Sequence, residues 1–158
     1  MSSAMTACAH QRTDAMDIFR TALIAGVACA AGPAWSAESP IADADARGIF
    51  IEAQHLCQVD GGQLWGQSLC APMMLVDPKS RQVTASHADV HGALKGRGEV
   101  FVGQLPPDAI VANTAVEWSG IRWTQLLWPL PQDVSRRSTL LAHEMFHRLQ
   151  PALPITAP

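Results

Sequence analysis

Two stretches near the C-terminal end show the alternation of apolar and polar positions that is typical of β-strands. Residues 110–118 and 121–130 both follow this pattern, and Ser119-Gly120 lies between them. Two such runs around a short turn that contains Gly predict a β-hairpin. In the second arm both sets of alternate positions include apolar residues. That arm is therefore expected to be covered on one side and partly covered on the other.

A helical period follows the hairpin. Leu141, Met145 and Leu149 recur at i, i+4 and i+8, which predicts a helix over residues 134–150 with one apolar side. Asp133 is a suitable N-cap for this helix. We expect the apolar stripe to lie in the core.

Weaker patterns precede these elements and complete the expected fold. Residues 42–56 have a weak helical period, and the apolar run 73–76 ends at a turn signal, with residues 82–86 as its hairpin partner. Residues 90–98 hold three glycines and predict a loop, whereas residues 99–103 predict a strand. The elements together predict an α+β fold: a small antiparallel sheet with a β-hairpin that leads into a C-terminal helix.

The N-terminal end has the organisation of an export signal. Arg12 and Arg20 precede the apolar run 21–31, and small residues follow that run. We predict that residues 1–37 are a signal peptide and that the mature protein is periplasmic or secreted. The alternative is a buried helix of the domain. The apolar run is too short to span a bilayer, so no membrane span is expected after cleavage.

Composition limits the remaining chain to one globular domain. The 158 residues are 48% apolar and 16% charged, which is sufficient for a core. The formal net charge is −3, and there is no run of Lys or Arg, so a nucleic-acid partner is not expected. Residues 38–158 are therefore predicted to form a single α+β domain.

Two cysteines remain after signal cleavage, Cys57 and Cys70. Export places them in an oxidising compartment, which favours a disulfide. The bridge would close a loop that contains Gly61, Gly62 and Gly66, and it would stabilise the fold by roughly 3 kcal/mol. Ligation of a metal ion is the alternative, although cysteine pairs that bind zinc usually lie two to four residues apart.

Residues 143–147 read His-Glu-Met-Phe-His and are the one segment that indicates a chemistry. On a helix, side chains four positions apart share a face, so His143 and His147 can reach one metal ion. Glu144 lies about 100° from His143 and about 60° from His147 around the helix. Two neutral imidazoles suit Zn²⁺, and a carboxylate beside an activated water is the general base of metal hydrolases.

The arrangement of hairpin and HExxH helix resembles the zincin metallopeptidases, over roughly residues 110–150. It is most similar to the gluzincins, in which a Glu on a later helix is the third zinc ligand. The resemblance implies that His143 and His147 bind zinc and that Glu144 is the general base. It also implies that a peptide or protein substrate lies along an edge strand of the sheet.

No residue of this sequence is an evident third zinc ligand. No Asp or Glu follows Glu144, so the ligand that the resemblance implies would lie beyond Pro158, in a longer protein, or would be lost from a truncated product. His87, His91 and Glu117 are upstream substitutes, although the polar setting of the two histidines is more typical of a surface loop.

Two functions are compatible with these patterns. The first is an exported zinc-dependent metallopeptidase, or a fragment of one, that hydrolyses peptide bonds by zinc-activated water with Glu144 as general base. The second is a non-catalytic exported α+β module that binds a partner or belongs to the envelope and has a vestigial metal motif. Its HExxH helix would be a surface helix with a solvated Glu144.

Overall fold

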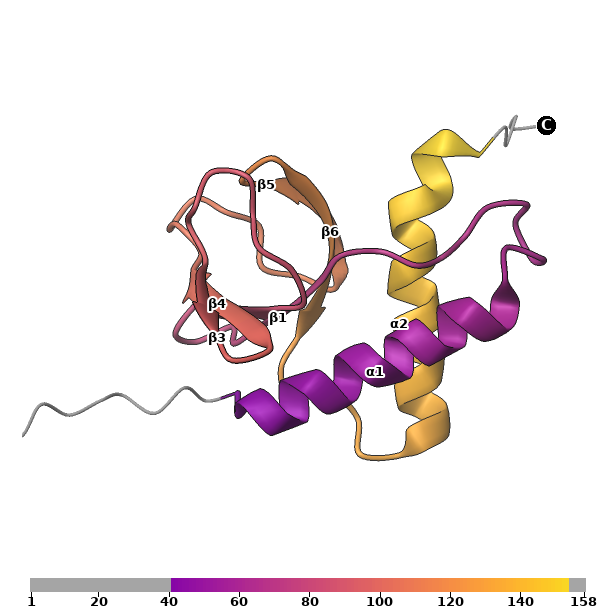
Figure 1. Ribbon diagram of the computed structural model, residues 1–158, viewed down its shortest axis with the longest axis horizontal. Coiled ribbons are helices and arrows are strands. Elements are labelled where there is room, and N and C mark those ends of the chain that lie inside the picture. Colours follow the sequence, from indigo (N-terminus) through magenta and orange to yellow (C-terminus); the bar gives the residue numbers. More distant parts are fainter. Residues whose placement is uncertain (1–40, 154–158) are drawn as a thin grey trace, which may run out of the picture. The chain divides into compact units, whose positions relative to one another are not determined.

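The computed structural model describes residues 41–153 (Figure 1). The predicted signal peptide, residues 1–37, lies outside the described residues. The fold is α+β, as predicted. Its elements are, in chain order, α1 (Asp43–Asp60), β1 (Met73–Val76), β2 (Gln82–Ala85), β3 (Lys95–Arg97), β4 (Val100–Gln104), β5 (Thr114–Trp118), β6 (Ile121–Leu127), α2 (Val134–Leu149) and the 3-10 helix η1 (Gln150–Ala152).

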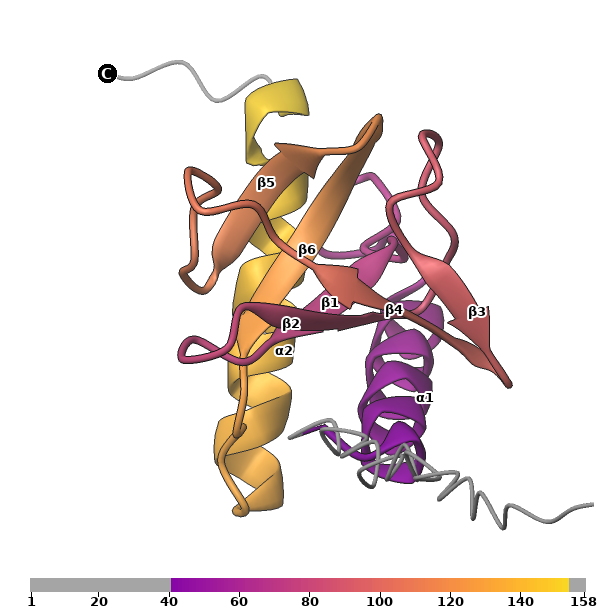
Figure 2. The same ribbon diagram turned by 90° about the vertical axis from the view of Figure 1, so that its left-hand side faces the viewer.

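The strands form one six-stranded sheet in the order β3-β4-β2-β1-β6-β5 (Figure 2). Neighbouring strands are antiparallel except β1 and β6, which are parallel, with Met73 opposite Thr124. The prediction of an antiparallel sheet is therefore wrong at this central pair. All four residues of β1 are buried, and a strand that is covered on both faces carries no local signal for the direction of its partner.

Both helices lie on the same face of the sheet (Figures 1 and 2). Alternate side chains of β1 enter different halves of the core, because successive residues of a strand point to opposite faces. Met73 and Leu75 pack in the half that contains the helices, whereas Met74 and Val76 pack in the other half. The helices therefore bury one face of the sheet.

The HExxH helix, α2, forms as predicted. Its apolar stripe is in the core, where Leu141, Met145 and Leu149 are 0%, 2% and 6% exposed. The Asp133 side chain accepts a hydrogen bond of 2.9 Å from the backbone N–H of Arg136, which confirms the predicted N-cap. Neither α1 nor α2, the α-helices within residues 41–153, is both long and apolar enough to cross a membrane.

The predicted β-hairpin is present, although its strands are shorter than the expected 110–118 and 121–130. Helix α1 and residues 90–98 also differ from the prediction. Helix α1 continues to Asp60, beyond the expected residues 42–56, and ends where Gly61 adopts a left-handed conformation with φ of 55°. Residues 90–98 were expected to form a loop only, but they contain β3, which pairs with β4. All three residues of β3 are exposed, so the strand has no apolar alternation that could reveal it.

The predicted disulfide between Cys57 and Cys70 is present, so the alternative that these cysteines bind a metal is wrong. We call residues 58–69, which the bridge encloses, the disulfide loop. The carboxylate of Asp60 accepts hydrogen bonds from the backbone N–H groups of Gly62 and Leu64, at 3.0 and 3.2 Å. The loop is therefore held at its base by a covalent bond and by hydrogen bonds.

Candidate metal centre

His143 and His147 lie one turn apart on α2, away from its core stripe, and we call them the histidine pair. Their Nε2 atoms are 2.9 Å apart, and the planes of the two rings meet at 88°. His143 is exposed and His147 is partly buried, with its Nδ1 at 3.1 Å from Oε1 of Gln150. An Nδ1–H that donates to this oxygen leaves the Nε2 lone pair free to bind a metal ion.

The spacing of the histidine pair is compatible with zinc. Two nitrogens bound to one tetrahedral zinc ion at 2.0–2.1 Å lie about 3.3 Å apart. The two Nε2 atoms are slightly closer, at 2.9 Å, so a small rotation of either ring is sufficient. In the metal-free protein the same spacing suits a hydrogen bond in which one ring donates to the other.

Glu144 is buried, with 4% of its surface exposed. Among residues 41–153, its Oε2 has no hydrogen-bond partner. Burial raises the pKa of this carboxyl group above its ordinary value, although the neighbouring His143 and His147 act in the opposite direction. The alternative in which Glu144 is a solvated surface residue is therefore wrong. A buried acceptor without a hydrogen-bond partner lowers the stability of the fold. Such unpaired groups are often found where a side chain has a role in a functional site.

Helix α2 packs against the β5–β6 hairpin. Arg148 lies one turn after Glu144 on the same side of α2. On that side, Nε of Arg122 in β6 donates to the backbone carbonyl of Arg148 at 3.2 Å. Burial, and secondarily the Arg122 charge, lower the pKa of Arg148. Beyond β6 lies β5, which is an edge strand of the sheet (Figure 2). The buried carboxylate therefore lies on the side of α2 that packs against the sheet.

The upstream candidates for a third ligand do not join the histidine pair. Within residues 41–153, no three side chains of His, Cys, Asp or Glu come together in a way that could hold a metal ion. His87 Nδ1 lies 2.7 Å from Ser86 Oγ, and Glu117 accepts a hydrogen bond of 3.2 Å from Arg122. Nε2 of His91 lies beside the turn at Gly120. The described residues therefore bring two imidazoles together, His143 and His147, and no third candidate ligand joins them.

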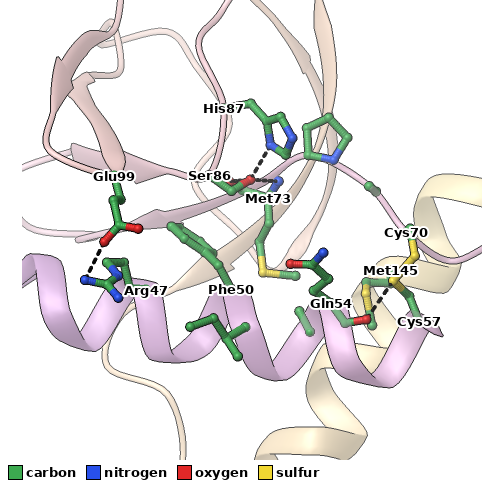
Figure 3. Close-up of a pocket in the computed structure, with 14 residues that line it drawn as sticks. Arg47, Phe50, Gln54, Cys57, Cys70, Met73, Ser86, His87, Glu99 and Met145 are labelled. Atoms are coloured by element: carbon green, nitrogen blue, oxygen red, sulfur yellow. Dashed lines mark hydrogen bonds and ion pairs between the residues drawn. A yellow bond between two sulfur atoms is a disulfide. The ribbon is translucent and has the colours of Figure 1, made fainter. Parts of the chain in front are cut away.

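A groove lies on another side of α2. It has a volume of about 570 Å³ and runs between α1 and the sheet (Figure 3). Phe50, Met73, Ser86, His87 and Met145 are among the residues that line it. Met145 belongs to the core stripe of α2, so the groove is separated from the histidine pair by the helix itself. The groove therefore contributes nothing to the metal centre.

The structure adds one neighbour of the motif that the sequence did not indicate. Trp65, in the disulfide loop, stacks on Phe146 with the ring centroids 4.3 Å apart and a tilt of 36°. The centroid of Phe146 is in turn 6.2 Å from that of His147. A single Trp in a Gly-rich loop belongs to no periodic pattern, so the sequence around Trp65 did not predict its contact with Phe146. The only indication was the predicted disulfide, which holds the loop near the helices.

Comparisons of the chain with protein-family models, with curated proteins and with solved structures give no match.

Proposed function

We propose that this protein is an exported zinc-dependent metallopeptidase, or a fragment of one, as the resemblance to zincins implies. The observation that carries the proposal is the combination of three side chains on α2. The two Nε2 atoms of the histidine pair converge to 2.9 Å, and the buried carboxylate of Glu144 lies beside them without a partner. A surface helix without a function has no reason to bury a carboxylate next to two imidazoles.

In this proposal His143 and His147 hold the zinc ion, and Gln150 orients the ring of His147 through Nδ1. When bound, zinc polarises the scissile carbonyl and activates water for attack. Glu144 accepts the proton of the attacking water and passes it to the leaving amine. Its enclosed position supports this role, because burial raises its pKa and so makes the carboxylate a better proton acceptor.

The edge strand β5 is the proposed site for the substrate backbone. Its inner side pairs with β6 over residues 114–118, and no described strand pairs with its outer side. An extended peptide can add to such an edge through main-chain hydrogen bonds. The resemblance to zincins implies the same placement, in which the peptide crosses in front of the HExxH helix.

One observation favours a second candidate function, a non-catalytic exported binding or envelope module. Catalytic zinc normally has three protein ligands, and the described residues bring two together. With this pair alone, zinc affinity should be well below that of a three-ligand site. A module of this second kind would keep α2 for packing and would bind metal weakly or not at all.

Metal titration of the oxidised protein separates the two candidates. We expect zinc to bind the wild type with a 1:1 stoichiometry and to be lost in both His143→Ala and His147→Ala. His91→Ala is the matched control, because it removes a histidine that lies outside the pair. Equal zinc binding by wild type and His143→Ala would place the metal elsewhere and would remove the basis of the peptidase proposal. Chelator-sensitive cleavage of a peptide library, absent in Glu144→Gln, would then identify the reaction.

A further inference from the structure

An aromatic surface borders the histidine pair on the side away from Glu144. It consists of Trp65 and Phe146, and we call it the aromatic surface; Leu64 precedes Trp65 in the loop. Leu64 and Trp65 are 74% and 42% exposed, although both are large apolar residues. Stacking on Phe146 therefore covers only part of Trp65 and leaves the remainder in contact with solvent.

The helical period places the histidine pair between this surface and the hairpin. Around α2, Glu144 lies about 60° from His147, and Phe146 lies about 60° from His143 on the opposite side. On the Glu144 side, Arg122 of β6 contacts Arg148, one turn after Glu144, whereas Phe146 contacts Trp65 of the disulfide loop. Figure 1 shows the connection from α1 to β1 passing beside α2. The pair is thus flanked on one side by the edge of the sheet and on the other by aromatic rings.

The position of Trp65 is fixed by several independent features of the loop. The Cys57–Cys70 bridge closes it, and Asp60 accepts hydrogen bonds from two of its backbone N–H groups. Nη2 of Arg148 on α2 also donates to the carbonyl oxygen of Cys70 at 3.3 Å. A tryptophan on so constrained a loop keeps its exposed face beside the motif helix.

The chemistry of the surface limits what it can bind. Residues 61–69 of the loop contain no Asp, Glu, Lys, Arg or His. The one charged residue of the loop, Asp60, already accepts hydrogen bonds from two backbone N–H groups at the base of the loop. Exposed Trp and Phe rings bind apolar groups through area burial and through ring stacking. The aromatic surface is therefore suited to a large uncharged side chain, and above all to an aromatic one.

We propose that Trp65 and Phe146 form a specificity subsite that accepts the large apolar side chain of a peptide bound at the histidine pair. This inference rests on the proposed peptidase function, and it names the class of substrate: peptides with an aromatic or large aliphatic residue next to the scissile bond. In this view the backbone of the peptide lies along β5, and Trp65 of the disulfide loop contacts one of its side chains.

Two peptide hydroxamates that differ only in a benzyl or a methyl side chain test the subsite in the zinc-loaded, oxidised protein. We expect calorimetry to show that the benzyl compound binds the wild type at least about tenfold more tightly. This preference should fall to twofold or less in Trp65→Ala and should return in Trp65→Phe, while affinity for the methyl compound stays unchanged. Ile51→Ala, which removes an exposed apolar side chain from the separate groove, is the control and should keep the preference.

A wild type without a preference, or a Trp65→Ala variant that retains it, would overturn the subsite. A metal-free measurement keeps this result distinct from failure of the peptidase proposal. The indole N–H signal of Trp65, assigned in NMR spectra by comparison with Trp65→Phe, should shift on titration with N-acetyl-phenylalanine amide and not with the alanine analogue. If zinc does not bind but this shift occurs, the subsite stands and the peptidase proposal fails. If no shift occurs, the subsite is wrong whether or not zinc binds.

Discussion

Replacement of Glu144 by Gln tests the central feature of the site, a buried carboxylate without a partner. The substitution keeps the size of the side chain and removes its charge. Because burial raises the pKa of Glu144 in the folded protein, folding favours the protonated form of this group. The ionised form therefore lowers the stability of the metal-free protein. This effect is absent below the unfolded-state pKa of about 4.3 and is complete above the raised pKa of the folded state.

The size of the effect follows from the burial of one oxygen atom. Oε2 of Glu144 is buried with no hydrogen-bond partner among the described residues, and such an atom costs about 1–3 kcal/mol, or more when it is charged. The Gln amide keeps a polar atom at this position, so we expect only part of the cost to be relieved. Glu144→Gln should increase the free energy of unfolding by about 1 kcal/mol at pH 7.5 and raise Tm by about 4 °C for a domain of this size.

Urea unfolding of the metal-free, oxidised protein at several pH values between 4.5 and 8 measures this difference. The advantage of Glu144→Gln should be greatest at the upper end of the range and should shrink toward pH 4.5, where the wild type becomes protonated. Addition of zinc should also shrink it, because a cation at the histidine pair favours the ionised carboxylate. Glu117→Gln is the matched control, since that side chain is 66% exposed and its substitution should change stability by less than about 0.5 kcal/mol.

A metal-free Glu144→Gln variant that is less stable than the wild type at pH 7.5 would refute this reasoning. It would mean that the folded protein stabilises the carboxylate, so that Glu144 has a structural partner and is not held free for a reaction.

Three further predictions concern the fold and its location. Removal of the disulfide by the double substitution Cys57→Ser and Cys70→Ser should lower the free energy of unfolding, measured with urea, by roughly 3 kcal/mol, because the bridge spans 13 positions. An unchanged free energy of unfolding would mean that the loop is ordered without the bridge. Leu141→Ala should lower the free energy of unfolding by about 2–5 kcal/mol in the same assay, since Leu141 is fully buried. Val134→Ala, at a position that is 62% exposed, should lower it by less than about 0.5 kcal/mol. Equal losses would contradict the assignment of Leu141 to the core. N-terminal sequencing of protein from an expressing bacterium should find a mature chain that begins near residue 37 outside the cytoplasm; an intact Met1 in the cytoplasmic fraction would disprove export.

The local elements of this fold could be predicted because their signals are short in range. The turn at Ser119-Gly120, the N-cap at Asp133 and the stripe through Leu141 each depend on residues within a few positions of one another. The parallel pairing of β1 with β6 could not be predicted, because β1 is an apolar run buried on both faces, and such a strand carries no local signal for the direction of its partner.

The candidate site was predictable in its residue types and less so in its environment. The spacing of His143 and His147 predicted that their rings would share a face, and the structure brings the two Nε2 atoms together. Burial of Glu144 depends on how α2 packs against the hairpin, which is a tertiary property that the motif does not encode. The contact of Trp65 with Phe146 joins a loop to a helix some 80 positions later and has no sequence pattern. Zinc binding and the role of Glu144 as base stay predictions.

The parallel pairing of the central strands also has a consequence for the order of folding. The hairpin β5–β6 and the disulfide loop are local, whereas β1 and β6 join positions about 50 residues apart. The entropy of closing so large a loop must be lost before the pairing contributes any stability, so we expect β1 to dock on β6 late. Trp65 precedes β1 in the chain, and the HExxH motif follows β6. Trp65 and the histidine pair therefore lie in segments that this late step brings together. We expect Trp65 to reach Phe146, beside the histidine pair, only when β1 docks on β6.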